Sequence, residues 1–127
     1  MSIQIKAVER GQPGIAGGGA RKYYASPVHG KEVSLDGLTR GMEKTSTVSG
    51  AAIRAVLYAM VEETVIGLSE GRIIRLGDLG SLRITISSEG RNTPEEVTAT
   101  AVKKAGVIFT PGKKLQEMLK TAKFSKA

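Results

Sequence analysis

The sequence predicts an α+β fold for this chain of 127 residues. Three observations carry the prediction: a nearly all-apolar run over residues 50–69, two β-rich runs between Arg72 and Ile86, and a basic C-terminal end. Only Gly77 and Asp78 separate the two β-rich runs, and this pair supplies the positive φ that a tight hairpin needs. The expected order is therefore helices, hairpin, polar arm and a basic final helix.

Composition limits the class of protein. This length, with 40% hydrophobic residues, suits one domain with an N-terminal addition. The chain has no Cys, which excludes disulfides and thiolate metal sites, and no run approaches the roughly 18 apolar residues of a membrane span. We expect a soluble cytoplasmic protein with no membrane partner.

The charge balance favours a polyanionic partner. There are 19 Lys and Arg against 12 Asp and Glu, a formal charge of +7. Seven Lys and a single acid, Glu117, fall between Lys103 and the C-terminus, which places the excess there. Aromatic residues make up 4% of the chain, too few for a protein that stacks single-stranded bases. Duplex or backbone recognition fits better.

The N-terminal segment predicts a β-hairpin. Alternation of apolar and polar residues in Met1 to Val8 is typical of a half-buried strand, and Lys22 to Val28 resumes as a second one. The glycine-rich stretch Gly11 to Ala20 matches no phosphate-loop motif and indicates a flexible loop. We assign residues 1–32 to this extension and residues 33–127 to the main domain.

Two helices are expected next, from Leu35 to Lys44 and from Gly50 to Ser69. Ser34 is the candidate N-cap of the first, while Thr47 and Ser49 are alternative N-caps for the second.

The second helix is apolar around most of its circumference, so it must pack on more than one side. Homodimerisation is the simplest way for a small domain to cover such a helix. The residues expected in the core or dimer contact are Val56, Met60, Leu79, Leu82 and Phe109.

After the hairpin, residues 87–96 are polar and turn-rich, and residues 97–109 resume as a strand broken at 103–106. Thr110 is then the expected N-cap of the last helix, with Pro111 at its first position.

Three motifs in this order resemble the HU and integration host factor family of bacterial DNA-binding proteins, over residues 33–120. They are Leu-Gly-Asp-Leu-Gly-Ser-Leu at 76–82, Gly-Arg-Asn followed by Pro94 at the arm, and Phe-Thr-Pro-Gly-Lys-Lys-Leu at 109–115. The N-terminal strand pair is similar to a longer HU-like subfamily.

The resemblance implies two N-terminal helices, an antiparallel sheet with a protruding β-arm and a short C-terminal helix. It also implies an intertwined homodimer, an architectural protein of the nucleoid whose arms reach around double-stranded DNA. Lys113 and Lys114 open the last helix, where the Gly112 region is expected to offer unpaired backbone N–H groups to phosphates. The expected DNA-contacting residues are Arg83, Arg91, Lys103, Lys104, Gly112, Lys113, Lys114 and Lys120.

The arm departs from the arginine-rich family pattern. Between Ile84 and Val102, Arg91 is the only basic residue against three Glu. Pro94 could replace the family's intercalating proline at a shifted position, or simply fix a turn. The main prediction is low-specificity duplex DNA binding through phosphates, with bending in doubt. The alternative is a structural or protein-interaction module on the same dimer scaffold that has lost DNA binding.

No catalytic or metal-binding constellation emerges. His29 is the only histidine, Asp78 sits in a tight turn, and Ser81 has no nucleophile-elbow context. We predict no enzyme, cofactor, metal or small-molecule substrate.

Overall fold

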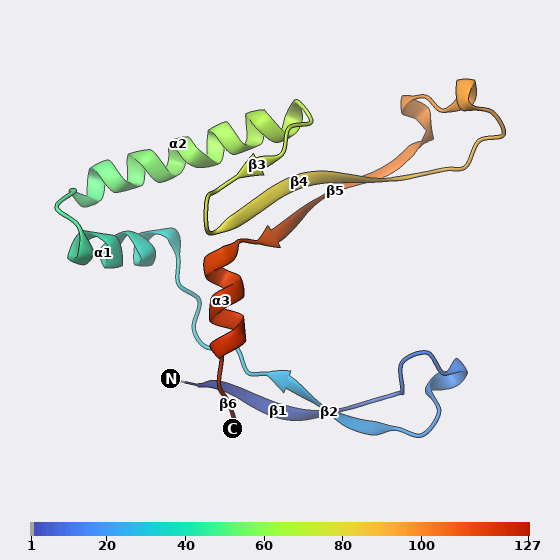
Figure 1. The fold of residues 1–127 in the computed structure, drawn as a ribbon, viewed down its shortest axis with the longest axis horizontal. Helices are drawn as coiled ribbons and strands as arrows, with labels where there is room; N and C mark the ends of the chain where they lie inside the picture. Colours follow the sequence, from blue (N-terminus) through green and yellow to red (C-terminus); the bar gives the residue numbers. More distant parts are fainter. Residues whose placement is uncertain (1) are drawn as a thin grey trace. The chain divides into compact units, whose positions relative to one another are not determined.

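The computed structural model describes residues 2–127 and contains both helices and strands (Figure 1). Three short 3-10 turns, η1 to η3, accompany them. In chain order the elements are β1 (Ile3–Arg10), η1 (Ala16–Gly18), β2 (Lys22–Pro27), α1 (Leu35–Thr45), α2 (Gly50–Ser69), β3 (Ile74–Arg75), β4 (Gly80–Ser88), η2 (Pro94–Glu96), η3 (Ala99–Ala101), β5 (Val102–Pro111), α3 (Lys113–Thr121) and β6 (Phe124–Lys126).

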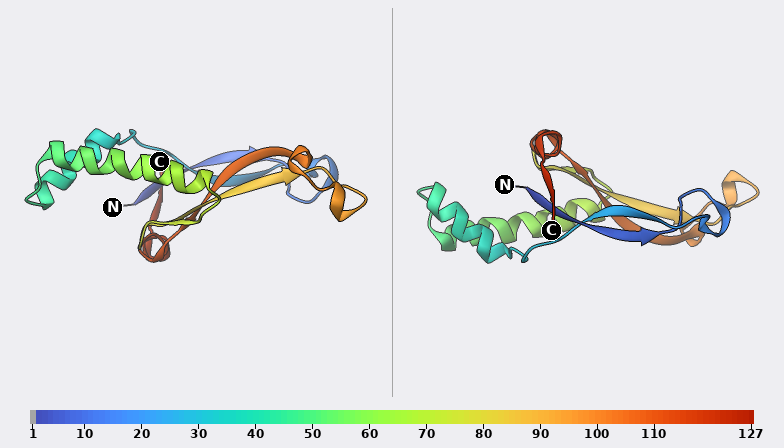
Figure 2. Two further views of the ribbon diagram at one scale, coloured as in Figure 1. Left: turned by 90° about the horizontal axis from the view of Figure 1, so that it is seen from above. Right: turned by 90° about the horizontal axis from the view of Figure 1, so that it is seen from below.

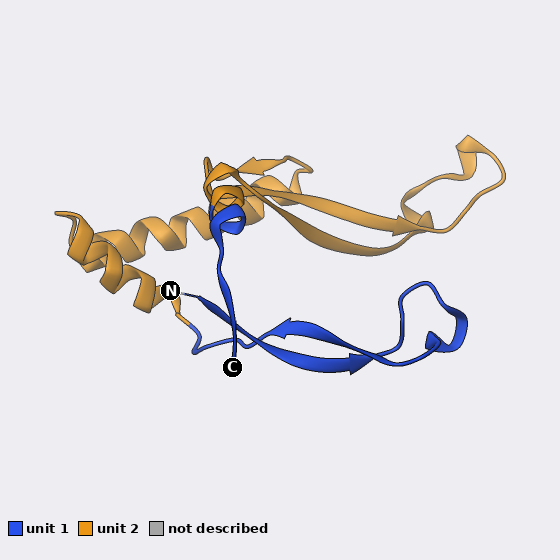
Figure 3. Cartoon of the chain, turned by 60° about the horizontal axis from the view of Figure 1, so that its bottom comes forward, with its two compact units in different colours: residues 1–32, 118–127 blue, residues 33–117 orange. Residues whose placement is uncertain are grey.

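The chain divides into two compact units (Figure 3). Unit 1 comprises Met1–Glu32 and Met118–Ala127, and unit 2 comprises Val33–Glu117. The last ten residues thus lie in the same compact unit as the N-terminal strands. The cause is strand β6, which pairs with β1 and is too short to give a sequence pattern of its own.

Unit 1 is built on a three-stranded sheet with the order β2-β1-β6. β1 and β2 pair antiparallel from Ile5↔Pro27 to Arg10↔Lys22, which confirms the predicted N-terminal hairpin. β6 pairs parallel to β1 from Ile3↔Phe124 to Ile5↔Lys126. The glycine-rich connection contains only the short turn η1.

The helices of unit 2 begin where local capping predicts. The Ser34 hydroxyl accepts the Gly37 N–H at 3.1 Å, and the Ser49 hydroxyl accepts the Ala52 N–H at 3.3 Å. Ser49, rather than Thr47, is therefore the N-cap of α2. α2 spans the predicted residues and ends before Gly71, whose φ of 77° suits the turn that follows a helix.

Much of the apolar surface of α2 is left exposed by the chain itself. Only Ile53 and Gly67 are buried in this helix, while Val56 and Val65 are 66% and 61% exposed. Gly67 lies against β3, since a Cβ atom there would come within 2.4 Å of the Ile74 side chain. The C-terminal end of α2 thus packs on the sheet and its N-terminal part contacts α1, while side chains such as Val56 and Val65 stay exposed.

The sheet of unit 2 has the order β3-β4-β5, and Figure 2 shows the β4–β5 ribbon twisting along its length. β3 and β4 confirm the predicted hairpin, with a turn closed by the Leu79 N–H donating to the Leu76 carbonyl. β3 has only two residues, shorter than expected.

Two boundaries predicted after the arm are wrong. β5 continues through residues 103–106 with a bulge at Lys103, because pairing with β4 extends from Pro111 to Val102. The turns η2 (Pro94–Glu96) and η3 (Ala99–Ala101) precede it, where the start of the strand was expected. Thr110 and Pro111 still pair with Ser81 and Gly80, so α3 begins at Lys113 rather than at Pro111. In both cases pairing with a distant strand overrides the local signal.

Candidate nucleic-acid interface

Cross-strand pairing sorts the side chains of the β3-β4-β5 sheet onto two faces, because directly paired residues project to the same side. One face, called here the polar face, carries three cations among small and hydroxyl residues and one apolar side chain, Ile108. Its paired rows are Arg75–Ser81–Thr110, Arg83–Ile108, Thr85–Gly106 and Ser87–Lys104.

The opposite face of the same sheet is apolar. Its rows are Ile74–Leu82–Phe109, Ile84–Val107 and Ile86–Ala105. Ile86, Val107 and Phe109 are 59%, 55% and 44% exposed, so the described chain leaves much of this face uncovered. The sheet therefore presents cations on one side and an unpacked hydrophobic layer on the other.

Arg75 is a further candidate that the sequence analysis did not name, although the sequence carried a signal for it. The alternation in Arg72-Ile-Ile-Arg-Leu puts Ile74 and Arg75 on opposite faces of a strand. Arg75 pairs with Ser81 and so shares the polar face with Arg83. Arg72 lies outside the ladder and pairs instead with Glu70, at 3.3 Å between Nε and Oε2.

The start of α3 is fastened to the hairpin turn by two backbone hydrogen bonds. The Gly112 N–H donates to the Leu79 carbonyl at 2.9 Å, and the Lys114 N–H donates to the Asp78 carbonyl at 3.2 Å. The expectation of unpaired N–H groups is therefore wrong for these two positions. A Cβ atom on Gly112 would lie 2.5 Å from the Asp78 carbonyl oxygen, so the glycine permits this close approach.

The lysines of α3 are exposed. Lys113 and Lys114 occupy its first turn, directly after the fastened Gly112, and Lys120 lies in its last turn. Because the hydrogen bonds tie the helix start to the turn between β3 and β4, Lys113 and Lys114 belong to the same rigid frame as the hairpin.

At the arm tip, Arg91, which we expected to contact DNA, forms an ion pair within the chain. Arg91 is 23% exposed and pairs with Glu89, Nη1 to Oε2, at 2.6 Å. Pro94 opens the turn η2 and is exposed, and the Thr93 hydroxyl donates to Glu96 Oε1 at 3.1 Å. Lys103 sits at the β-bulge, where the register shifts between Ser87 and Ser88.

The predicted core residues are mostly uncovered in the single chain. Val56, Met60, Leu79 and Phe109 are 66%, 40%, 49% and 44% exposed, and Leu82 is half-buried. None of the five is buried by the described chain itself.

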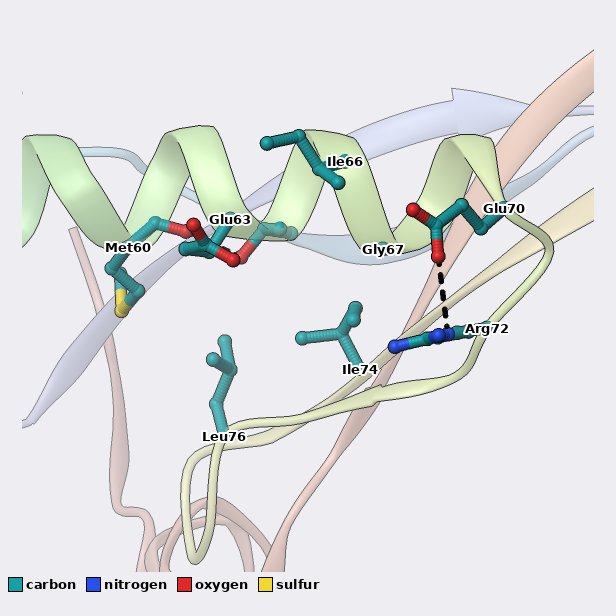
Figure 4. Close-up of a pocket in the computed structure, with 9 residues that line it drawn as sticks. Met60, Glu63, Ile66, Gly67, Glu70, Arg72, Ile74 and Leu76 are labelled. Carbon is teal, nitrogen blue, oxygen red and sulfur yellow. Dashed lines mark hydrogen bonds and ion pairs between the residues drawn. The ribbon is translucent and has the colours of Figure 1, made fainter.

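A groove of about 490 Å³ lies between the C-terminal half of α2 and β3 (Figure 4). Met60, Ile66, Ile74 and Leu76 supply apolar lining, and the Glu70–Arg72 ion pair closes one side. Glu63 and Thr64 add polar groups to the lining. Residues 2–127 contain no cluster of three or more acidic, His or Cys side chains that could hold a metal ion. Within the same residues, no helix has the length and apolar content to cross a membrane.

Comparisons with known proteins found one family model and a solved structure with a similar fold. A solved structure from Bacteroides vulgatus, provisionally described as a bacterial DNA-binding protein, matches with a TM-score of 0.70 at 14% identity. The match covers 98% of this chain and 48% of the other, so the chain spans about half the length of that protein. No curated protein matches the sequence.

A family model described as an HU domain fused to a wHTH, Ig or glycine-rich motif matches residues 1–126. The predicted resemblance to HU-like proteins is thereby confirmed. The match covers both units, including the N-terminal strands that ordinary HU lacks. The chain belongs to this HU-HIG family.

Proposed function

We propose that the chain is a non-enzymatic, nucleoid-associated protein that binds double-stranded DNA with low sequence specificity, as a homodimer and chiefly through phosphate contacts. The single observation that carries the proposal is the two-sided β3-β4-β5 sheet, with Arg75, Arg83 and Lys104 on one face and an uncovered hydrophobic layer on the other.

The hydrophobic layer supports the homodimer. The apolar face of the sheet is largely uncovered, with Ile86, Val107 and Phe109 exposed. The sides of α2 are uncovered too, since Val56 and Val65 are more than half exposed. A second copy offers surfaces of the same chemistry and length, and symmetric pairing of this kind is the commonest assembly of soluble proteins.

The polar face supports phosphate binding. Lys, Arg, Ser and Thr side chains supply most protein contacts to DNA phosphates, and these contacts carry no sequence information. Arg83 and Lys104 share this face with Thr85 and Ser87. The paired rows of the face contain no acidic residue. Lys113 and Lys114 add two exposed cations at the start of α3, which hydrogen bonds hold to the hairpin turn.

The arm supports backbone binding over insertion. Its Arg91 is already paired with Glu89, and the exposed Pro94 is followed by Glu95 and Glu96. Acidic side chains beside the turn repel phosphates. We therefore assign the affinity to the sheet and α3, and treat any bending as secondary.

One observation favours a second candidate, a structural or protein-interaction module that has lost DNA binding. Unit 2 carries eleven Lys and Arg against ten Asp and Glu, so it is nearly neutral as a whole. A near-neutral unit suits a scaffold that meets other proteins.

Substitution of the α3 lysines separates the two candidates. For the full chain with Lys113→Gln and Lys114→Gln, we expect at least tenfold weaker binding to labelled duplex DNA by fluorescence anisotropy. The salt dependence should also drop, by roughly 0.9 in log–log slope for each lost phosphate contact.

The matched control neutralises Arg40 and Lys44, two exposed cations on α1, with the same Gln substitutions. We expect the affinity of this control for duplex DNA to stay within twofold of that of the unsubstituted protein. Both variants should keep the molecular mass that the unsubstituted protein has in solution. Equal effects of the two pairs would contradict the assigned interface, and no duplex binding by the unsubstituted protein would favour the scaffold candidate.

A further inference from the structure

We propose that the β2-β1-β6 sheet of unit 1 carries a second phosphate-binding surface for duplex DNA. This surface rests on the proposed function for its ligand, but it uses residues of the other compact unit. It gives the N-terminal extension a role in DNA binding.

The register of the sheet brings the basic residues of unit 1 to one face. Arg10 and Lys22 are direct cross-strand partners, and Lys6 lies on the same side of β1, two alternations away from Arg10. The rows of this face are Gln4–Ser125, Lys6–Ser26, Val8–Tyr24 and Arg10–Lys22. These paired rows contain no acidic residue. We call this surface the basic face.

The other face of the sheet is mostly apolar and holds the acid. Its rows are Ile3–Phe124, Ile5–Pro27 with Lys126, Ala7–Ala25 and Glu9–Tyr23. Glu9 is paired with Arg21 at 3.1 Å, so its charge is compensated on that side. The sheet is therefore amphipathic, with three uncompensated cations concentrated on one side.

The distribution of charge between the units points the same way. Unit 1 has eight Lys and Arg against two Glu, a net charge of +6, whereas unit 2 has eleven against ten, a net charge of +1. Nearly all of the formal charge of +7 thus belongs to the smaller unit. A protein that neutralises DNA phosphates needs local positive charge, and this unit holds most of it.

The geometry suits the backbone of a duplex. Lys6 and Arg10 are four residues apart on a strand, about 14 Å at the strand rise. Phosphates of one DNA strand recur every 3.4 Å along the axis, so this separation spans roughly four of them. Ser26 and Ser125 add hydroxyl groups, which also bind phosphate oxygens.

Other polyanions fit the basic face less well. Its aromatic residue, Tyr24, is half-buried, which leaves no open ring for stacking unpaired bases. The strongly exposed apolar side chains of this sheet, Tyr23 and Phe124, lie on the opposite face. A membrane-surface site combines basic residues with inserted apolar ones, and the basic face lacks the second component.

The test compares two triple variants of the full chain. One replaces Lys6, Arg10 and Lys22 by Gln; the control replaces Lys31, Lys123 and Lys126, cations of the same unit outside the basic face, by Gln. Binding of each to labelled duplex DNA is measured across a salt series. We expect the basic-face variant to lose about 2.7 from the log–log slope and the control less than half of that. Circular dichroism checks that both variants keep their fold.

The Lys113→Gln, Lys114→Gln variant is measured beside them, because it reports on unit 2. If it weakens binding while the basic-face variant matches its control, the second surface is overturned and the proposed interface stands. If only the basic-face variant weakens binding, the second surface stands and the α3 assignment fails. Absence of duplex binding by the unsubstituted protein overturns both. The last measurement is binding to anionic vesicles. If the basic-face variant loses vesicle binding while the salt slope of its DNA binding is unchanged, DNA is overturned as the ligand of this surface.

Discussion

At the scale of single residues, Arg72 and Arg75 lie three positions apart but have different surroundings, and only Arg75 is available to contact DNA in our proposal. Arg72 pairs with Glu70 outside the β-ladder, while Arg75 shares the polar face with Arg83. We expect Arg75→Gln to lower the salt slope for duplex DNA by about 0.9, the loss of one phosphate contact, and to weaken binding equally across DNA sequences.

Arg72→Gln is the matched control, since it removes the same charge from the same segment. We expect it to leave the slope unchanged and to alter stability little, because exposed ion pairs contribute about 0–1 kcal/mol. A sequence-dependent loss, or equal losses for both variants, would speak against Arg75 as a phosphate contact.

Gly112 is explained by close packing. We predict that Gly112→Ala lowers the free energy of unfolding by about 1–3 kcal/mol, because the new methyl group would meet the backbone of Asp78 and Gly80. Chemical denaturation measures the loss. Gly90→Ala, where no heavy atom lies within 4 Å of the added Cβ, should change stability by less than about 0.5 kcal/mol. A neutral Gly112→Ala would refute the packing role.

The sequence alone was enough to name the lysines after Gly112 as candidates, but it did not reveal the packing role of the glycine. Its neighbours at residues 78–80 are more than thirty positions away, and only the fold brings them together. The alternation of residues in the strand was enough to find Arg75, and its pairing with Ser81 shows which face of the sheet it lies on. Site residues on regular strands are thus more readily predicted than those at contacts distant in sequence.

At the scale of elements, the choice between two alternative caps for α2 gives a direct test. Ser49→Ala removes the hydroxyl that accepts the Ala52 N–H and should cost about 1 kcal/mol of stability. Thr47→Ala, two residues earlier, is the control and should be close to neutral. Thermal or denaturant unfolding reports both, and a larger loss at Thr47 would reassign the cap.

The arm tip tests whether insertion contributes to function. Pro94 opens the turn η2 beside two acidic residues, so we expect Pro94→Ala to leave the bend of bound duplex DNA unchanged. Energy transfer between dyes at the two DNA ends measures that bend. A large loss of bending in this variant would show that Pro94 acts as a wedge rather than as a turn residue.

Elements with local signals were predicted well, and elements set by distant pairing were not. α2 has the predicted bounds because its cap and its terminating glycine lie within the segment itself. The strand predicted over 97–109 is confirmed from residue 102 onward, but its start at 97 and the helix start at Pro111 were wrong, because β5 follows its partner β4. β6 was missed because three residues show no period, and its pairing with β1 joins the two ends of the chain.

At the scale of the whole molecule, the unpacked apolar surface of α2 predicts a homodimer. We expect light scattering at micromolar concentration to give twice the 13.4 kDa mass of the chain. Val65→Lys, on a 61% exposed apolar position, should shift the mass toward the monomer because it places a charge in the contact. Glu62→Lys, on the polar strip of the same helix, should not. A monomeric unsubstituted protein would contradict the dimer.

The sequence places the excess of basic residues at the C-terminal end of the chain. The fold divides these lysines between the two units: Lys103 to Lys114 belong to unit 2, and Lys120 to Lys126 belong to unit 1. Together with Lys6, Arg10 and Lys22, the later lysines make the N-terminal unit the more basic one. The charge of a unit depends on which segments fold together, and linear position does not report it.

The most direct test of phosphate-based DNA binding is a salt titration of the unsubstituted protein with duplex DNA, single-stranded DNA and RNA of equal length. We predict preferential binding to duplex DNA with a log–log slope of about −3.6 or steeper, as at least four phosphate contacts require. A flat salt dependence, or no preference for duplex DNA over the other two, would contradict it.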